Sequence, residues 1–152
     1  RAEKLDTKLS SDLLELPFLP ADANSLATRN LLRGQSFLIP SGEQIAEAIG
    51  QTTADIEKVV DHVHDNVGSI DLSNGIPLWY YILAEAECIG RNDGNTNSPG
   101  EGLGPVGATI VGETLIGLLE LDTTSFLCVN RNWTPSLGNG NDFTMADLLT
   151  FQ

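Results

Sequence analysis

The chain has 152 residues, 41% of them hydrophobic and 19% charged, which is typical of a globular protein with a hydrophobic core rather than of a disordered segment. Its 21 Asp and Glu residues outnumber its 8 Lys and Arg residues, giving a formal net charge of −13. This charge argues against nucleic acid and anionic membranes as partners, because both require a basic face. No apolar run approaches the roughly 20 residues that a membrane helix needs, so we expect no membrane span.

Helical periodicity and capping residues organise the first part of the chain. Leucines at positions 5, 9, 13 and 16 follow a helical rhythm that two prolines end. Ser25, Ser41 and Thr53 are suited to open further helices, and Gly50 and Gly90 to close them. The sequence therefore predicts helices over residues 25–33, 41–50, 53–66 and 77–89.

The second part continues with a polar loop, RNDGNTNSPGEG, and a long apolar helix over residues 104–121. Thr144 and Asp147 form a cap-like start for a helix over 144–151. No segment alternates like a strand for more than a few residues, so the predicted fold is all-α. The segment LWYYIL and the 104–121 helix are apolar over more than one stripe. We expect each to leave an uncovered apolar face in a chain of this size.

Two acidic segments contain metal-ligand residue types at unfavourable spacing. In DHVHD, His62 and His64 would point about 200° apart on a helix, so they cannot bind one ion together. Asp61 and Asp65 share a face, where a solvated surface is the better interpretation than a metal site.

The loop residues Asp93, Asn95 and Asn97 alternate as in a calcium loop. Ser98 stands where such a loop needs glycine, and Gly104 where it needs glutamate, so a surface loop is favoured. Glu85 and Glu87 would be an acid/base pair only if they were buried, and we expect both at the surface.

Cys88 and Cys128 permit one disulfide, and the sequence favours a bridge and two buried thiols equally. Their spacing resembles neither a zinc site nor a redox motif. Asn132 begins NWT, which fits the acceptor pattern for N-glycosylation.

The stretch RNLLRGQSFLIPSG places Asn30 between Arg29 and Arg33 in otherwise apolar surroundings. On a helix Asn30 and Arg33 are three residues apart and share a face. Their side chains offer donors for a carboxylate and an acceptor for an N–H group. The alternative is structural: Arg33 pairs with a nearby carboxylate of the chain, and Asn30 caps a neighbouring element.

Four segments in this order resemble the C-terminal part of the animal-type haem peroxidases, the peroxidase–cyclooxygenase superfamily, and above all its bacterial members. The segments are RNLLRGQSFLIPSGEQIAEAIG, IPLWYYILAEAE, GLGPVGATIVGETLIGLL and FTMADLL. The resemblance implies that residues 1–152 form a single segment of a large, mainly α-helical haem domain. It also implies that the distal His and Arg, the proximal His and a calcium loop lie upstream of this segment.

Within that family an Asn-x-x-Arg motif follows the proximal His, and Asn30 and Arg33 match it, with Pro40 at the matching proline. The resemblance implies that Asn30 accepts the ring N–H of the proximal His and that Arg33 contacts a haem propionate. An amide acceptor would fix the ring orientation of the His, and a guanidinium suits a carboxylate. Gln35, Ser36 and Phe37 depart from the Arg-Asp-His run of many animal relatives.

Two functions follow as expectations. In the first, the chain is part of a secreted or extracellular haem peroxidase that uses hydrogen peroxide to oxidise small donors. It would supply the proximal wall, depend on the N-terminal part of the domain or a second chain, and be inactive alone. In the second, the helices serve a non-catalytic binding or structural module, since a fold alone does not define a function.

Overall fold

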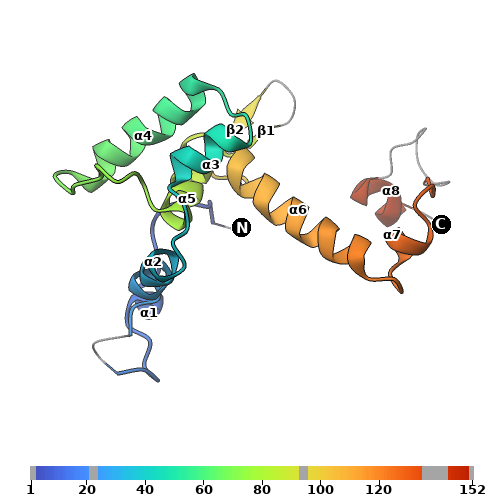
Figure 1. Ribbon diagram of the computed structural model, residues 1–152, viewed down its shortest axis with the longest axis horizontal. Coiled ribbons are helices and arrows are strands. Elements are labelled where there is room, and N and C mark those ends of the chain that lie inside the picture. Colours follow the sequence, from blue (N-terminus) through green and yellow to red (C-terminus); the bar gives the residue numbers. More distant parts are fainter. Residues whose placement is uncertain (1–2, 21–23, 93–95, 135–143, 151–152) are drawn as a thin grey trace. The chain divides into compact units, whose positions relative to one another are not determined.

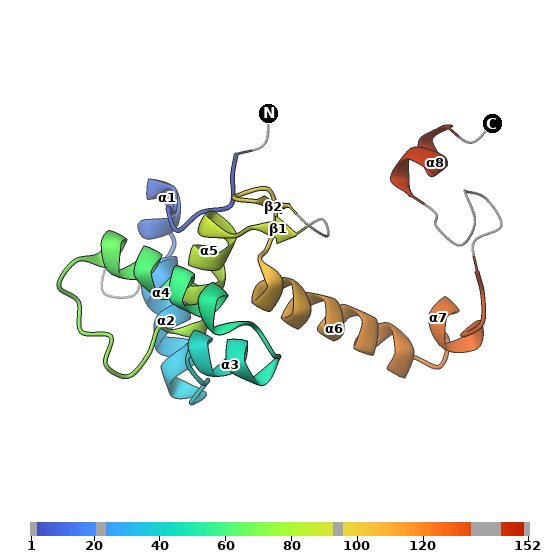
Figure 2. The same ribbon diagram turned by 90° about the horizontal axis from the view of Figure 1, so that it is seen from above.

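The computed structural model describes residues 3–20, 24–92, 96–134 and 144–150, which divide into two compact units, Arg1–Val111 and Gly112–Gln152. In this part of the chain helices make up the fold, and the only strands form a short antiparallel pair (Figures 1 and 2). The prediction of a helical fold is therefore confirmed. In chain order the elements are α1 (Ser11–Leu14), α2 (Leu26–Ser36), α3 (Gly42–Ala48), α4 (Thr53–Val67), α5 (Leu78–Cys88), β1 (Arg91–Asn92), β2 (Asn97–Ser98), α6 (Pro105–Leu121), α7 (Phe126–Val129) and α8 (Met145–Thr150).

The helices begin where the sequence supplies capping side chains. The Ser25 hydroxyl accepts the Thr28 backbone N–H, and Ser41 forms a reciprocal capping box with Gln44. Helix α4 begins at Thr53, as predicted, and its capping residue lies one position earlier. The cap is Thr52, whose hydroxyl oxygen accepts the Asp55 N–H at 3.2 Å.

The helical rhythm of the early leucines is realised only in part, because α1 covers only Ser11–Leu14. The backbone before it bonds to distant groups instead of to itself. The Leu5 N–H donates to the Gly100 carbonyl at 2.9 Å, and the Thr7 N–H donates to Glu87. These bonds satisfy donors that a helix would otherwise use, so tertiary contacts override local periodicity here.

The core of unit 1 forms around α5, which contacts α2, α3 and α4 (Figure 1). Tyr81 is its largest fully buried side chain and is 1% exposed. Gly42, the first residue of α3, lies directly against the Tyr81 ring, and a Cβ atom at this position would overlap the ring. The core residues are Ala46, Val59, Val63, Ile76, Tyr81, Ala84, Ile89 and Val106.

A second set of contacts joins the start of α3 to the segment before α5. The Gly42 N–H donates to the Ile76 carbonyl at 2.8 Å, and Ser41 and Pro77 form an antiparallel bridge. In return the Ile76 N–H donates to the Glu43 carboxylate at 3.0 Å. These bonds fix the ends of α3 and α5 that border the cavity described below.

The expected apolar exposure is confirmed for α6 and wrong for LWYYIL. In α5 Tyr81 is buried, and the other residues of that segment are half-buried. From Val111 onward, in contrast, the apolar side chains of α6 are exposed on several sides, with Leu121 82% exposed. Among the described residues, no helix is both long enough and apolar enough to cross a membrane.

The contact between Gly42 and Tyr81 gives a stability prediction. Gly42→Ala should lower the free energy of unfolding by about 3 kcal/mol, because the added methyl group would displace the largest core side chain. Gly34→Ala is the matched control, because Gly34 has no neighbouring atom within 4 Å of its Cβ position. That variant should gain about 0.5–1 kcal/mol from higher helix propensity. Urea unfolding measures both, and equal effects would contradict the described packing.

Candidate functional site

Unit 1 contains a cavity of about 720 Å³, within the range of sites for cofactors and small molecules. Residues of α2 and α5 surround it, together with the segment that follows α2, the segment that precedes α5, and Ile110 of α6. Most of the lining is apolar, and its side chains include Asn30, Arg33, Phe37, Trp79, Ile82 and Ile110.

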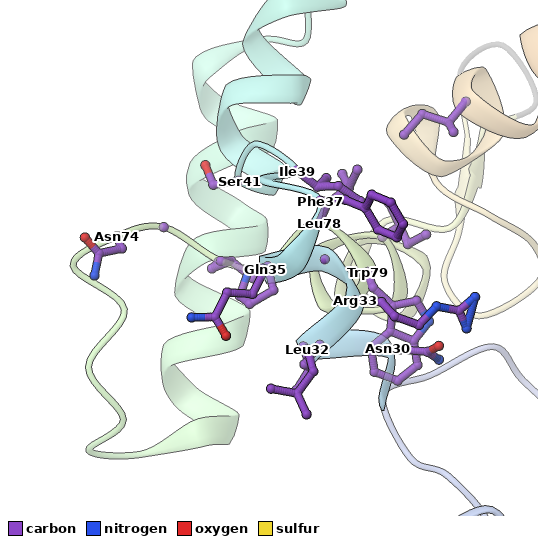
Figure 3. Close-up of a pocket in the computed structure, with 17 residues that line it drawn as sticks. Asn30, Leu32, Arg33, Gln35, Phe37, Ile39, Ser41, Asn74, Leu78 and Trp79 are labelled. Atoms are coloured by element: carbon purple, nitrogen blue, oxygen red, sulfur yellow. The ribbon is translucent and has the colours of Figure 1, made fainter. Parts of the chain in front are cut away.

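Asn30 and Arg33 both line this cavity, as their spacing on one helix predicted. Figure 3 shows them on the side of α2 that faces Trp79, whereas Gln35, another lining residue, lies on a different side of the helix. Phe37, which immediately follows the helix and lies seven residues after Asn30, continues the same face. Asn30 is half-buried and Arg33 is exposed, so the guanidinium lies at the open edge of the cavity.

The structural alternative for these two residues is not what the structure shows. In the described part of the chain the Arg33 side chain has no ion-pair or hydrogen-bond partner, and neither has the Asn30 amide. Among the described residues, the cavity therefore presents one free cation, Arg33, and the free amides of Asn30, Gln35 and Asn74 beside apolar walls.

Glu85 is buried, and the prediction that it lies at the surface was wrong. Its side chain is 2% exposed, and its carboxylate accepts the Val106 N–H at 3.0 Å and the Gly107 N–H at 3.2 Å. These are the second and third residues of α6, whose first N–H groups have no partner within the helix. The Glu85 carboxylate thus caps α6 from another helix and stabilises its positive end.

Two sequence signals point to this contact in retrospect. Glu85 lies four residues after Tyr81 and so shares its buried face. The long helix beginning at Pro105 is preceded by Leu103 and Gly104, neither of which has a capping side chain. Gly104 is required at its position, because a Cβ atom there would overlap the Glu85 side chain.

The environment of Glu85 changes its ionisation. Burial raises the pKa of Glu85 above its ordinary value, although the hydrogen bonds from Val106 and Gly107 act in the opposite direction. The nearby Asp55 carboxylate raises the pKa further. Burial also raises the pKa of the Tyr81 hydroxyl, with a smaller contribution from Glu85, so this phenol stays neutral.

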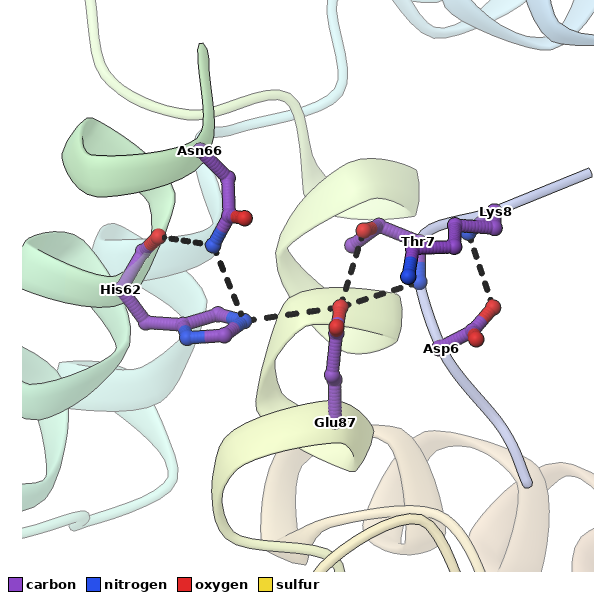
Figure 4. A network of polar contacts seen from close by, with 6 residues as sticks. All are labelled: Asp6, Thr7, Lys8, His62, Asn66 and Glu87. Carbon is purple, nitrogen blue, oxygen red and sulfur yellow. Dashed lines mark hydrogen bonds and ion pairs between the residues drawn. The ribbon is translucent and has the colours of Figure 1, made fainter. Parts of the chain in front are cut away.

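Glu87, on another face of α5, is half-buried rather than fully at the surface. Figure 4 shows its carboxylate between α4 and the N-terminal segment. It accepts the Thr7 hydroxyl at 2.8 Å and the Thr7 N–H at 3.1 Å, and its Oε2 lies 3.4 Å from His62 Nε2. Partial burial acts to raise the pKa of Glu87, but these hydrogen bonds outweigh it and lower the pKa.

The residues of the DHVHD segment differ in their surroundings. His62 faces Glu87, whereas His64, Asp61 and Asp65 are exposed. No group of three or more metal-ligating side chains occurs among the residues with described positions. Of the three residues that alternate as in a calcium loop, Asn97 belongs to β2, and Asp93 and Asn95 lie outside the described residues.

The remaining candidates are single residues. Cys88 and Cys128 are half-buried free thiols belonging to the two different units, and burial raises the pKa of Cys88. Asn132 is exposed after α7, as a glycosylation acceptor must be.

Comparisons with known proteins found no family model that matches the chain, and no match among curated proteins or solved structures.

The raised pKa of Glu85 gives a prediction about pH. The folded chain binds the Glu85 proton more tightly than the unfolded chain does. The free energy of unfolding should therefore fall as the pH rises from the ordinary value of 4.5 through the raised pKa, and then level off. Glu85→Gln removes this contribution, so the variant should gain stability relative to the wild type as the pH increases.

Urea unfolding of both proteins between pH 4 and pH 8 measures this difference, since the two proteins differ only in the side chain at position 85. Glu47→Gln is the control, because it removes an exposed carboxylate of α3 and leaves the Glu85 contact intact. Parallel curves for the Glu85 variant and the wild type would show that burial does not govern the ionisation of Glu85.

Proposed function

We propose that this chain is the C-terminal helical part of a haem peroxidase domain and supplies the proximal wall of the haem pocket. The complete domain would use hydrogen peroxide to oxidise small donors outside the cell. One observation supports this most directly: Asn30 and Arg33, which match the family motif, line one apolar cavity and lack partners in the described chain.

The residues of the cavity fit haem chemically. Haem is a flat, largely apolar ring with carboxylates on one edge, so its site needs apolar walls and a cation at one rim. Trp79, Phe37, Ile82 and Ile110 supply such walls, and Arg33 supplies the cation at the open edge. The volume of about 720 Å³ is large enough for a ligand of this class.

Each of the two polar residues has a separate role in this proposal. Arg33 donates to a propionate, for which a planar guanidinium is the best partner. The Asn30 amide oxygen accepts the ring N–H of a histidine from the remaining part of the domain, which fixes the tautomer and orientation of that ring. Bound haem would supply the iron chemistry with peroxide, and the protein tunes it through such hydrogen bonds.

Uncovered apolar surface supports a larger domain. Leu38 is 87% exposed between the exposed Phe37 and Ile39, and α6 exposes apolar side chains from Val111 to Leu121. Soluble monomers rarely leave such surface open, so it marks a partner surface. We propose that the N-terminal part of the domain, or a second chain, covers these residues.

The test of this proposal is the visible spectrum and intact mass of the protein isolated from its source. A Soret band together with a larger parent or a co-purifying second chain would support the haem peroxidase. A colourless protein of this chain's mass, which binds no haemin when titrated, would favour the non-catalytic module instead.

Arg33→Ala should weaken haemin binding, because a propionate would lose its cationic partner. Arg33 is exposed in this chain, so solvent screening limits the loss to about 1 kcal/mol, or roughly fivefold in affinity. Arg29→Ala is the matched control, because Arg29 lies on the same helix but does not line the cavity. Haemin titration followed by absorbance measures both variants, and equal losses would show a general charge effect instead of a propionate contact.

Asn30→Asp should lower the reduction potential of the iron in the complete domain. A carboxylate is a stronger acceptor than an amide, so it increases the electron density that the histidine donates to the metal. Spectroelectrochemical titration measures the potential, with Asn30→Ala as the control that removes the acceptor. An unchanged potential in both variants would mean that Asn30 has no contact with the iron ligand.

A further inference from the structure

We infer that Glu85 is a positioning residue for the ligand of the cavity: by capping α6 it holds Ile110 in the cavity wall. The inference rests on the proposed function for the identity of that ligand, haem. The geometry that connects Glu85 to the wall does not depend on which ligand binds.

The Glu85 carboxylate contacts the first turn of α6. Both carboxylate oxygens lie 3.0 Å from the Val106 nitrogen, and one of them lies 3.2 Å from the Gly107 nitrogen. Gly104 leaves no space between its backbone and the Glu85 side chain, and the Cβ position of Gly107 lies 3.4 Å from Ile82. The first turn of α6 is therefore fixed against α5 by the Glu85 carboxyl acceptor and by close backbone packing.

Ile110 connects the first turn of α6 to the cavity. Val106 and Ile110 are four residues apart, so they lie on the same face of α6, one turn from each other. Val106 is 0% exposed in the core, and Ile110 packs against that core and also lines the cavity. Of the described lining residues, α6 contributes Ile110 alone.

On α5, too, Glu85 lies one helical turn from a residue of the cavity wall. Ile82 lines the cavity opposite the first turn of α6 and precedes Glu85 by one helical turn. Any rotation of α6 about the Glu85 contact changes the separation of Ile82 and Ile110. Glu85 does not itself line the cavity, so its effect on the ligand passes through Ile110.

A double-mutant cycle tests this route with the full 152-residue chain. The variants are Glu85→Gln, Ile110→Ala and their combination, with Glu47→Gln as the exposed-acid control. Affinity is measured with haemin by absorbance and with 8-anilinonaphthalene-1-sulfonate by fluorescence, since the latter is an apolar aromatic anion independent of iron chemistry. Hydrogen exchange at the Val106 and Gly107 amides reports the contact itself without a ligand.

Glu85→Gln should weaken binding of haemin about three- to tenfold and accelerate exchange at the two amides. In the Ile110→Ala background the same substitution should change the affinity less than about twofold, because the wall that Glu85 positions is already absent. An equal loss in both backgrounds would show that Glu85 only stabilises the fold, and would overturn the inference.

A folding check and the comparison of the two probes separate loss of fold, failure of the proposed function and failure of the positioning role. Circular dichroism checks that each variant is folded, and Gly104→Ala replaces Glu85→Gln if the latter unfolds, since it disturbs the same contact from α6. If the wild type binds the sulfonate but not haemin, the proposed function fails and the cycle is judged with the sulfonate. If Glu85→Gln leaves the affinity for the sulfonate unchanged, or if neither probe binds the wild type, the positioning role is wrong.

Discussion

A buried carboxylate at the start of a long helix constrains much of unit 1. Pro105 begins α6 without a local cap, so the first N–H groups of the helix require an acceptor from elsewhere, and Glu85 supplies it. Burying that charge costs free energy, as the raised pKa of Glu85 shows. Two backbone donors and the positive end of the helix offset part of this cost. The contact also explains why residue 104 is a glycine, because any side chain there would occupy the place of the carboxylate.

Helix α5 combines this contact with three others because its successive faces meet different neighbours. Tyr81 enters the core beside Gly42, Glu87 binds the N-terminal segment and His62, and Trp79 and Ile82 line the cavity. A helix with so few solvent-facing positions must be apolar over most of its surface. The apolar breadth of LWYYIL is thus accounted for by burial within unit 1, whereas that of α6 is not.

The sequence predicted what depends on neighbours along the chain. Caps at Ser25 and Ser41 and the spacing of Asn30 and Arg33 are local features, and the structure contains them. It failed where the partner is distant: Leu5 and Thr7 leave a helical pattern to bond with Gly100 and Glu87, which follow them by 80 residues or more. Glu85 was missed for the same reason, since its acceptor role is defined by α6 rather than by its own helix. The proposal of haem as the ligand came from the order of four sequence segments and not from any feature of the fold.

The charge of the chain limits which ligands the cavity can hold. A net charge of −13 repels anions at long range, but at physiological ionic strength charges beyond about 8 Å are largely screened. Near Arg33 no acidic side chain of the described chain lies at ion-pair distance, so the local site stays attractive to a carboxylate. An exposed arginine alone contributes little affinity. Most of the binding free energy must therefore come from the apolar walls around Trp79 and Ile110, which small inorganic anions cannot use. A large apolar acid satisfies both conditions, and a haem with its propionates at the open edge is such a ligand.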